Sequence, residues 1–195
     1  MPNYFEFEVC LDGVAPLIWR RFLLHEKATF LELHEAIQDA AQWWNYHLFI
    51  FQSKNGKIIA GLPSEDEMDL EGKETPDAEI IPIAPWFRAQ RVKTCHYEYD
   101  FGDGWECDVK LIQEVYDAKI FKRRLLGGER AFPHEDCGGN GGYQRCVEFV
   151  KTGKDPWNDS DDLKEWLGGW DPEKFEFKEV KKYFDKGRHV PIPGE

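Results

Sequence analysis

Two short stretches of the sequence gather side chains suited to binding a cation, an anion or a partner molecule. The first runs from Asp100 to Trp105 and reads Asp-Phe-Gly-Asp-Gly-Trp. The second runs from Glu135 to Tyr143 and contains an aspartate, a cysteine and four glycines. Carboxylate oxygens are preferred ligands of Mg²⁺ and Ca²⁺, and glycines let a backbone approach a ligand closely. These two stretches are therefore the candidate recognition surface.

The glycine-rich second stretch has several interpretations. Backbone amides at a helix start could hold an anion, but the Lys-Ser/Thr ending and preceding strand of a phosphate loop are missing. Cys137 and His134 have the residue types of a nucleophile and its base, which need the right geometry to act. A structural turn capped by Asp136 accounts for the same residues, and we favour it over a site formed by this stretch alone.

The histidines and cysteines give no sign of a zinc site. The six His and five Cys show neither a C-x-x-C pair nor two His at i and i+4. His34, beside Leu33 on a predicted helix, is expected to pack in the protein rather than to bind a metal. The sequence thus predicts no metal ligand, no catalytic residue and no cofactor.

The first stretch lies at the tip of a predicted hairpin over residues 96–111. Both arms alternate around Gly-Asp-Gly, and a three-residue loop would pair Phe101 with Trp105 and give one apolar face. That register sets Asp100 against Glu106 and Glu98 against Asp108 on the other face, and each like-charge pair costs about 0.2 to 1 kcal/mol. We expect solvent and neighbouring cations to offset this repulsion; a bound cation or a basic partner surface is the alternative.

Hydrophobic periodicity predicts the elements that carry these stretches. Thr29 and Glu32 form a capping box at the start of the clearest helix, and Asn55-Gly56 is a typical hairpin turn. Strands are predicted over 4–11, 17–24, 47–53, 57–61 and the arms of 96–111, and helices over 29–44, 143–153, 160–167 and 177–184. Residues 62–79 carry eight carboxylates against one Lys and are expected to form an exposed loop, and 187–195 a tail.

These elements predict an α+β fold. We expect a mostly antiparallel sheet of about five to seven strands, packed with about four helices, and leave open whether the sheet closes into a barrel. The length of 195 residues suits a single domain over 1–195.

Composition limits the partners. A net charge of -12 disfavours nucleic acid, whose affinity comes largely from Lys and Arg. Two compact basic groups, Arg20-Arg21 and Lys122-Arg123-Arg124, are expected to be solvated cations paired with carboxylates. Five cysteines at irregular spacing favour reduced thiols in the cytoplasm, and no apolar run is long enough to span a membrane. The expected partner is a protein.

Four motifs together resemble the plasmid ORF-3-like family, first seen on a root-inducing plasmid, in which some members are labelled mobile-element resolvase-like. The motifs are Ile18-Trp19-Arg20-Arg21, Leu33-His34 with Ile37-Gln38, Tyr99 to Asp103 with Trp105, and Glu135 to Gly139 with Tyr143. Family members often have His at the positions of Phe49 and Cys107 and Pro at that of His134, and the missing histidines weaken a metal site. Serine recombinase chemistry is not expected, because Ser53, Ser64 and Ser160 lack a surrounding Arg cluster.

The leading interpretation is a noncatalytic binding or protein-interaction domain associated with mobile elements. The predicted binding residues are Trp19, Arg20, Asp100, Asp103, Trp105, Glu135, Asp136, Cys137 and Tyr143. The alternative is a divalent-metal-dependent hydrolase or DNA-processing protein with Asp100, Asp103, Glu135 and Asp136 around the ion. The alternative requires the two stretches to converge in space, whereas the interaction domain needs them only to be exposed.

Overall fold

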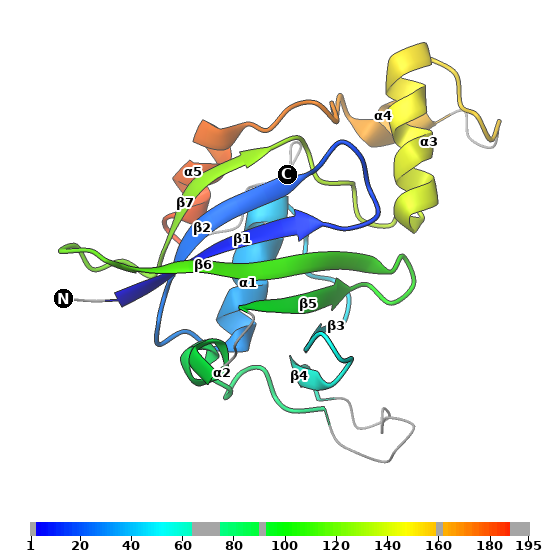
Figure 1. Ribbon diagram of the computed structural model, residues 1–195. Coiled ribbons are helices and arrows are strands. Elements are labelled where there is room, and N and C mark those ends of the chain that lie inside the picture. Colours follow the sequence, from blue (N-terminus) through cyan, green and yellow to red (C-terminus); the bar gives the residue numbers. More distant parts are fainter. Residues whose placement is uncertain (1–2, 64–74, 90–92, 159–161, 188–195) are drawn as a thin grey trace.

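Seven antiparallel strands form one open sheet in the order β4-β3-β5-β6-β1-β2-β7. The computed structural model describes residues 3–63, 75–89, 93–158 and 162–187 (Figure 1). The strands are β1 Asn3–Leu11, β2 Trp19–His25, β3 Phe49–Gln52, β4 Ile58–Gly61, β5 Thr94–Tyr99, β6 Trp105–Tyr116 and β7 Arg123–Glu129. The helices are α1 Phe30–Ala41, α2 Ile83–Ala89, α3 Gly139–Thr152, α4 Leu163–Leu167 and α5 Phe177–Phe184. The predicted α+β class is confirmed, and the sheet does not close into a barrel.

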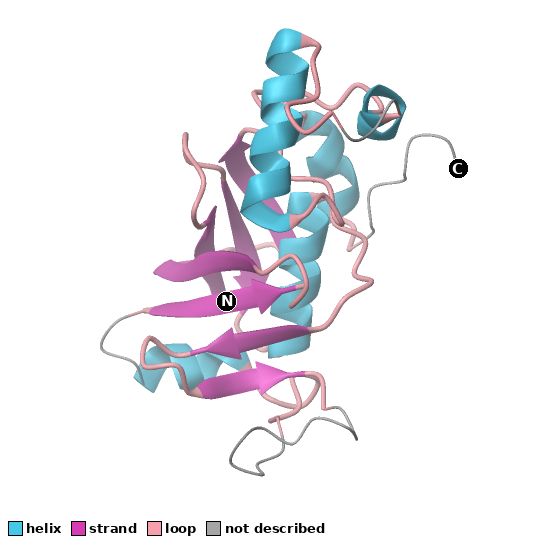
Figure 2. Cartoon of the chain, turned by 90° about the vertical axis from the view of Figure 1, so that its right-hand side faces the viewer, coloured by secondary structure: helices cyan, strands magenta, loops and turns pink. Residues whose placement is uncertain are grey.

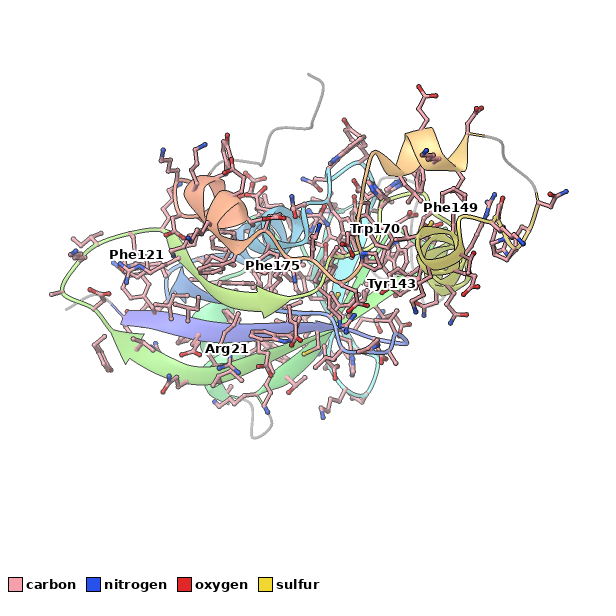
Figure 3. All side chains as sticks on the ribbon, turned by 90° about the horizontal axis from the view of Figure 1, so that it is seen from above. Arg21, Phe121, Tyr143, Phe149, Trp170 and Phe175 are labelled. Atoms are coloured by element: carbon pink, nitrogen blue, oxygen red, sulfur yellow. The ribbon has the colours of Figure 1, made fainter. Side chains whose placement is uncertain are left out.

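The helices cover one face of the sheet and one of its ends. α1 lies along one face, with α2 and α5 beside it, whereas α3 and α4 stand at the end where the β5–β6 hairpin turns (Figures 1 and 2). Arg21 lies on the opposite face from α5 (Figure 3). The two predicted stretches therefore lie at the end of the sheet that α3 borders.

β1 is an interior strand of the sheet and follows the predicted alternation. Phe5, Phe7 and Val9 are buried under the helices, while Glu8 on the other face pairs with Arg21 of β2. Burial of such side chains contributes about 1.5 to 3 kcal/mol each, which makes this face the core of the fold.

α1 begins as predicted and ends earlier. Thr29 and Glu32 form the capping box, in which each side chain accepts a hydrogen bond from the other residue's backbone N–H. The helix stops at Ala41 because Gln42 adopts a positive φ of 67°. The prediction that the helix reaches Trp44 is wrong, and Trp44 lies in the connection to β3 with 42% of its surface exposed.

The β5–β6 hairpin has a longer loop than predicted. Tyr99 pairs with Trp105 and Glu98 with Glu106, so residues 100–104 form the turn. The predicted three-residue loop, with Phe101 opposite Trp105, is wrong, and Phe101 is 44% exposed. The reason is a turn closed by Asp100, whose carbonyl accepts the Gly104 N–H at 2.6 Å. The shift of two residues leaves Tyr97, Tyr99 and Trp105 on the buried face as predicted.

Several other expectations are decided by the same structure. The hairpin at Asn55-Gly56 and helices α3 and α5 are present, whereas α2 and β7 were not predicted. Arg123 and Arg124 of β7 pair with Asp39 and Asp117, as expected of cations among carboxylates, but Arg123 is buried rather than solvated. Most of the predicted 62–79 loop, the Ser160 cap and the tail after Gly187 lie outside the described residues.

In the described part of the chain, no helix combines the length and apolar character needed to cross a membrane.

Candidate functional site

The two predicted stretches converge on one histidine. His47 Nε2 lies 3.1 Å from Asp136 Oδ1 and 3.6 Å from Asp100 Oδ2. One potential ligand atom from each of these three side chains lies within 4.8 Å of the others. We call His47, Asp100 and Asp136 the acidic triad; it joins the β5–β6 turn, the loop before α3 and the connection between α1 and β3.

Backbone conformation directs both carboxylates of the acidic triad. Asp100 has a φ of 56° and Asp136 a φ of 60°. Few residues other than glycine adopt such values, although Asp and Asn do so more readily than most. Backbone conformations of this kind are concentrated at ligand sites and turns, so the paired positive φ angles are consistent with a functional loop.

Asp100 is fixed by the turn that it closes. Its N–H donates to the Leu48 carbonyl at 3.0 Å, and its Oδ1 accepts the Gly102 N–H at 3.1 Å. Its side chain is only 9% exposed. The remaining oxygen, Oδ2, is the one that faces His47. Asp100 therefore presents a single, well-oriented carboxylate oxygen to the acidic triad.

Asp103 holds the two loops together rather than joining the acidic triad. Its Oδ2 accepts the Gly138 N–H at 3.1 Å. A Cβ on Gly139 would lie 2.4 Å from the Asp103 carbonyl oxygen, and Gly139 also has a positive φ of 63°. Only glycine allows this approach, which explains why the Gly-rich stretch follows Asp136.

Glu135 also supports the site from behind. It accepts a hydrogen bond from the Trp44 N–H at 2.5 Å and another from the Tyr99 hydroxyl. The Tyr99 oxygen in turn accepts the Tyr46 N–H at 3.1 Å. Burial raises the pKa of Glu135, and the hydrogen bonds from Tyr99 and Trp44 oppose that rise. Glu135 thus ties the segment that carries His47 to the loop that carries Asp136.

A buried network anchors the same segment to α1. His34 Nε2 lies 2.6 Å from Asn45 Oδ1, an acceptor, so Nε2 carries the proton and Nδ1 accepts the Tyr97 hydroxyl at 2.8 Å. Gln38 donates to the same hydroxyl at 2.8 Å and accepts the Asn45 N–H. Burial lowers the pKa of His34 to about 4, so it is neutral, and it packs as predicted.

Cys137 and Tyr143 pack behind the loop, beside α3. Interaction with the Cys146 thiol raises the pKa of Cys137, and the same interaction lowers the pKa of Cys146. Tyr143 is buried, and its ring meets Trp170 edge to face (Figure 3). His134 lies against Trp166 and Trp170, and among the described residues no hydrogen bond joins it to Cys137, whose sulfur lies 3.8 Å from the Gly139 carbonyl oxygen. A Cys137–His134 nucleophile pair is therefore not formed.

Three predicted binding residues lie away from the acidic triad. Trp105 is 1% exposed and belongs to the core. Arg20 is also 1% exposed; its Nε donates to the Ala40 carbonyl at 2.8 Å, and burial lowers its pKa to about 9. Trp19 is half-buried and its indole N–H donates to Glu129 at 3.3 Å. Arg20 therefore stabilises the carboxyl end of α1.

Exposed apolar side chains adjoin the acidic triad along the chain. Tyr46 and Leu48 flank His47 and are 69% and 39% exposed, and Phe101 follows Asp100. Trp44 and Tyr46 meet edge to face with ring centroids 5.7 Å apart. We call Trp44, Tyr46, Leu48 and Phe101 the apolar rim.

His47 is the residue that the sequence did not single out. Only the strand pairing could have indicated that His47 belongs to the site. β3 pairs with β5 so that Phe49 lies opposite Tyr99, and this places the residues just before β3 beside Asp100. Without that pairing, one histidine near a strand has no distinguishing pattern. Its imidazole adds a nitrogen donor to the two carboxylates, a set suited to divalent cations such as Zn²⁺ or Mn²⁺.

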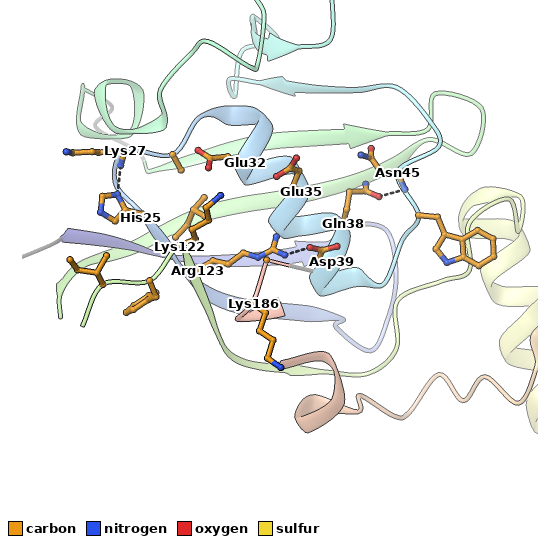
Figure 4. Close-up of a pocket in the computed structure, with 16 residues that line it drawn as sticks. His25, Lys27, Glu32, Glu35, Gln38, Asp39, Asn45, Lys122, Arg123 and Lys186 are labelled. Carbon is orange, nitrogen blue, oxygen red and sulfur yellow. Dashed lines mark hydrogen bonds and ion pairs between the residues drawn. The ribbon is translucent and has the colours of Figure 1, made fainter. Parts of the chain in front are cut away.

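A separate groove of about 800 Å³ runs along the polar side of α1 (Figure 4). Asp39 and Arg123 form a buried ion pair on its floor, and Arg123 also donates to the Phe184 carbonyl at 2.9 Å. Lys122, Lys186, Glu35 and Trp44 line it, and Asn45 stands at one end. We call this concavity the α1 groove.

Comparisons with known proteins identify relatives without an assigned activity. The family described as plasmid pRiA4b ORF-3-like protein matches residues 3–179. The uncharacterized protein y4hQ of Sinorhizobium fredii (strain NBRC 101917 / NGR234) is 31% identical over 181 residues, covering 91% of this chain and 89% of that protein. The crystal structure of MM3350 from Methanosarcina mazei Go1, a protein of unknown function, has a TM-score of 0.74 and 29% identity, and the match covers 91% of this chain and 96% of that one.

Proposed function

The chain belongs to the plasmid pRiA4b ORF-3-like family, and from this premise we propose that it is a noncatalytic binding domain that recognises a protein through a divalent cation. The observation that carries the proposal is the convergence of His47, Asp100 and Asp136 from three separate connections. The relatives are named only as uncharacterized or of unknown function, so the site itself supplies the argument.

The charge of the acidic triad supports a cation. Among the described residues, neither Asp100 nor Asp136 has a Lys or Arg within 4.0 Å, and both carboxylates share the single imidazole of His47. Asp100 is nearly buried, and a buried carboxylate is costly unless it is paired or coordinated. A divalent cation would neutralise both carboxylates at once.

The kind and number of ligands narrow the cation. An imidazole nitrogen favours Zn²⁺ and related transition metals, and carboxylates also accept Mn²⁺ and Mg²⁺. Three protein ligands leave coordination positions open for water or for an outside group. A carboxylate side chain of a partner protein could fill one of them, while the apolar rim supplies the hydrophobic contact that protein interfaces use at their centre.

The first test is calorimetric titration of metal-free protein with Zn²⁺, Mn²⁺, Mg²⁺ and Ca²⁺, repeated on Asp100→Asn and Asp136→Asn. Asn has nearly the same shape as Asp, tolerates positive φ and keeps the turn hydrogen bond at position 100, so both variants should fold. We expect micromolar binding of Zn²⁺ or Mn²⁺ by the natural protein and a loss in both variants.

The matched control is Asp108→Asn. Asp108 forms a similar His–Asp pair with His96 at 2.9 Å, on the exposed face of β6, away from the acidic triad. Its substitution should leave cation binding unchanged. Absence of binding at millimolar metal, or equal loss in the Asp108 control, would contradict the proposal.

A metal-dependent hydrolase is the second candidate, because three protein ligands with an open position also suit catalytic zinc. Two of the four carboxylates expected around such an ion have other roles: Asp103 binds Gly138, and Glu135 binds Tyr99 and Trp44. Turnover of chromogenic phosphate or carboxylate esters by the zinc- or manganese-loaded protein, abolished in Asp100→Asn, would favour the hydrolase over the binding domain.

A further inference from the structure

Two of the five cysteines form a thiol pair directly behind the acidic triad. Cys137 follows Asp136 in the chain and is half-buried, while Cys146 lies on α3 and is 4% exposed. Cys137 packs against the small apolar cluster of Cys146, Leu163 and Leu167, and its thiol interacts with that of Cys146. The two sulfur atoms are therefore neighbours in the folded protein.

Glycine at position 142 makes this approach possible. A Cβ on Gly142 would lie 1.6 Å from the Cys137 carbonyl oxygen, closer than any side chain allows. Gly142 and Cys146 are four residues apart on α3, so they occupy the same side of the helix. The loop at Cys137 thus lies against the helix face that carries Cys146, independently of the contact between the thiols.

We propose that Cys137 and Cys146 are an oxidisable pair that forms a reversible disulfide and thereby controls the cation site. With hydrogen peroxide as the oxidant, one of the two thiols is oxidised to a sulfenic acid, and one water is released. The sulfur of the other cysteine then attacks the sulfenic sulfur, the S–OH bond breaks, and the hydroxide leaves as water with the proton of the attacking thiol. Two thiols and one peroxide become one disulfide and two waters.

The effect on the cation site rests on the proposed function. A disulfide brings the two sulfurs to about 2.05 Å, closer than any contact between two free thiols, so the loop must move toward α3. Asp136 is the next residue, and a metal site tolerates ligand displacements of only about 0.2 Å. Oxidation should therefore weaken cation binding about tenfold, the lower end of the effect of disturbing groups that support metal ligands.

The test begins with oxidation of metal-free, full-length protein by hydrogen peroxide. Free thiols are counted in denaturant, and peptides are mapped by mass spectrometry without reduction. We expect the count to fall from five to three, with a Cys137–Cys146 linked peptide that dithiothreitol converts back. Zn²⁺ and Mn²⁺ titrations of the oxidised and reduced forms then measure the change in affinity.

Matched variants separate the possible outcomes. Cys146→Ser should prevent the disulfide, whereas Cys10→Ser, which removes the other half-buried cysteine, should leave it intact. A thiol count that stays at five, or a link between other cysteines, would overturn the pair. A disulfide with unchanged cation affinity would overturn its control of the site. Disulfide formation without cation binding in either form would remove the proposed function while the pair itself stands.

Discussion

The acidic triad and the α1 groove differ in how their charges are satisfied. In the α1 groove, Asp39 and Arg123 are buried together, and Arg123 also binds a backbone carbonyl. In the acidic triad, two carboxylates share one imidazole. The groove offers more volume, but its deepest charges already have partners. The comparison teaches that the two regions differ in charge compensation: Asp39 has a guanidinium partner, whereas Asp100 and Asp136 have one imidazole between them.

The largest expected effect is a loss of stability, and it tests whether the charged residues of the α1 groove hold the fold together. Asp39→Ala leaves Arg123 buried without its carboxylate, which should lower the free energy of unfolding by about 3 to 5 kcal/mol. Cation affinity should stay within about twofold, because the ion pair of Asp39 with Arg123 includes no residue of the acidic triad. Urea unfolding and zinc titration measure the two quantities. A large loss of cation affinity in the folded variant would erase the distinction between the regions.

The second prediction concerns His34, whose network joins Gln38 of the groove wall to the segment that carries His47. The folded-state pKa of about 4 lies below the unfolded value of 6.5, so protonation favours the unfolded chain. The stability from neutral His34 is complete above pH 6.5 and is lost as the pH falls toward 4, amounting to about 3 kcal/mol. Unfolding of the natural protein and of His34→Gln across this range isolates the effect; parallel pH curves would refute it.

The third prediction sharpens the chemistry of the acidic triad. His47→Asp replaces the nitrogen donor by a third carboxylate, which should lower Zn²⁺ affinity about tenfold and favour Mn²⁺ and Mg²⁺ relative to Zn²⁺. Calorimetry with all three metals tests this change. An unaltered order of metals would show that His47 is not a ligand, whatever the behaviour of the two aspartates.

The smallest effect belongs to the support behind the site. Tyr99→Phe removes the hydroxyl that donates to Glu135 and accepts from Tyr46, and should cost about 1 to 2 kcal/mol of stability. Because Tyr99 does not touch a cation, affinity should change less than in Asp100→Asn. Thermal unfolding and zinc titration compare the two variants; a reversed order of affinities would place Tyr99 in the binding chemistry.

Local patterns predicted the elements of the fold better than its contacts. The alternation in β1 and the capping box of α1 are properties of neighbouring residues, and both are confirmed. The hairpin register was not predictable in the same way, because a shift of two residues keeps every side chain on its original face. Only the contacts of Asp100 with Leu48 and Gly104 distinguish the two registers.

In the candidate site, too, residue types were predicted from the sequence and contacts between distant residues were not. Asp100 and Asp136 were predicted as binding residues, and the structure brings them together. His47 was missed because its role depends on the pairing of β3 with β5, which no local pattern reports. Arg20, predicted for binding, is instead buried against α1. The sequence did not indicate this, because its partner carbonyl at Ala40 lies twenty residues away.

The interior position of β1 in the sheet has a consequence for how the chain is made. β1 pairs with β2 on one side, but its other edge pairs with β6, where Asn3 lies opposite Tyr116. During synthesis the β1–β2 hairpin therefore emerges long before β6, with a strand edge of β1 open to other chains. Closing so long a loop slows folding. The nascent chain is thus most exposed to aggregation in the interval before β6 leaves the ribosome.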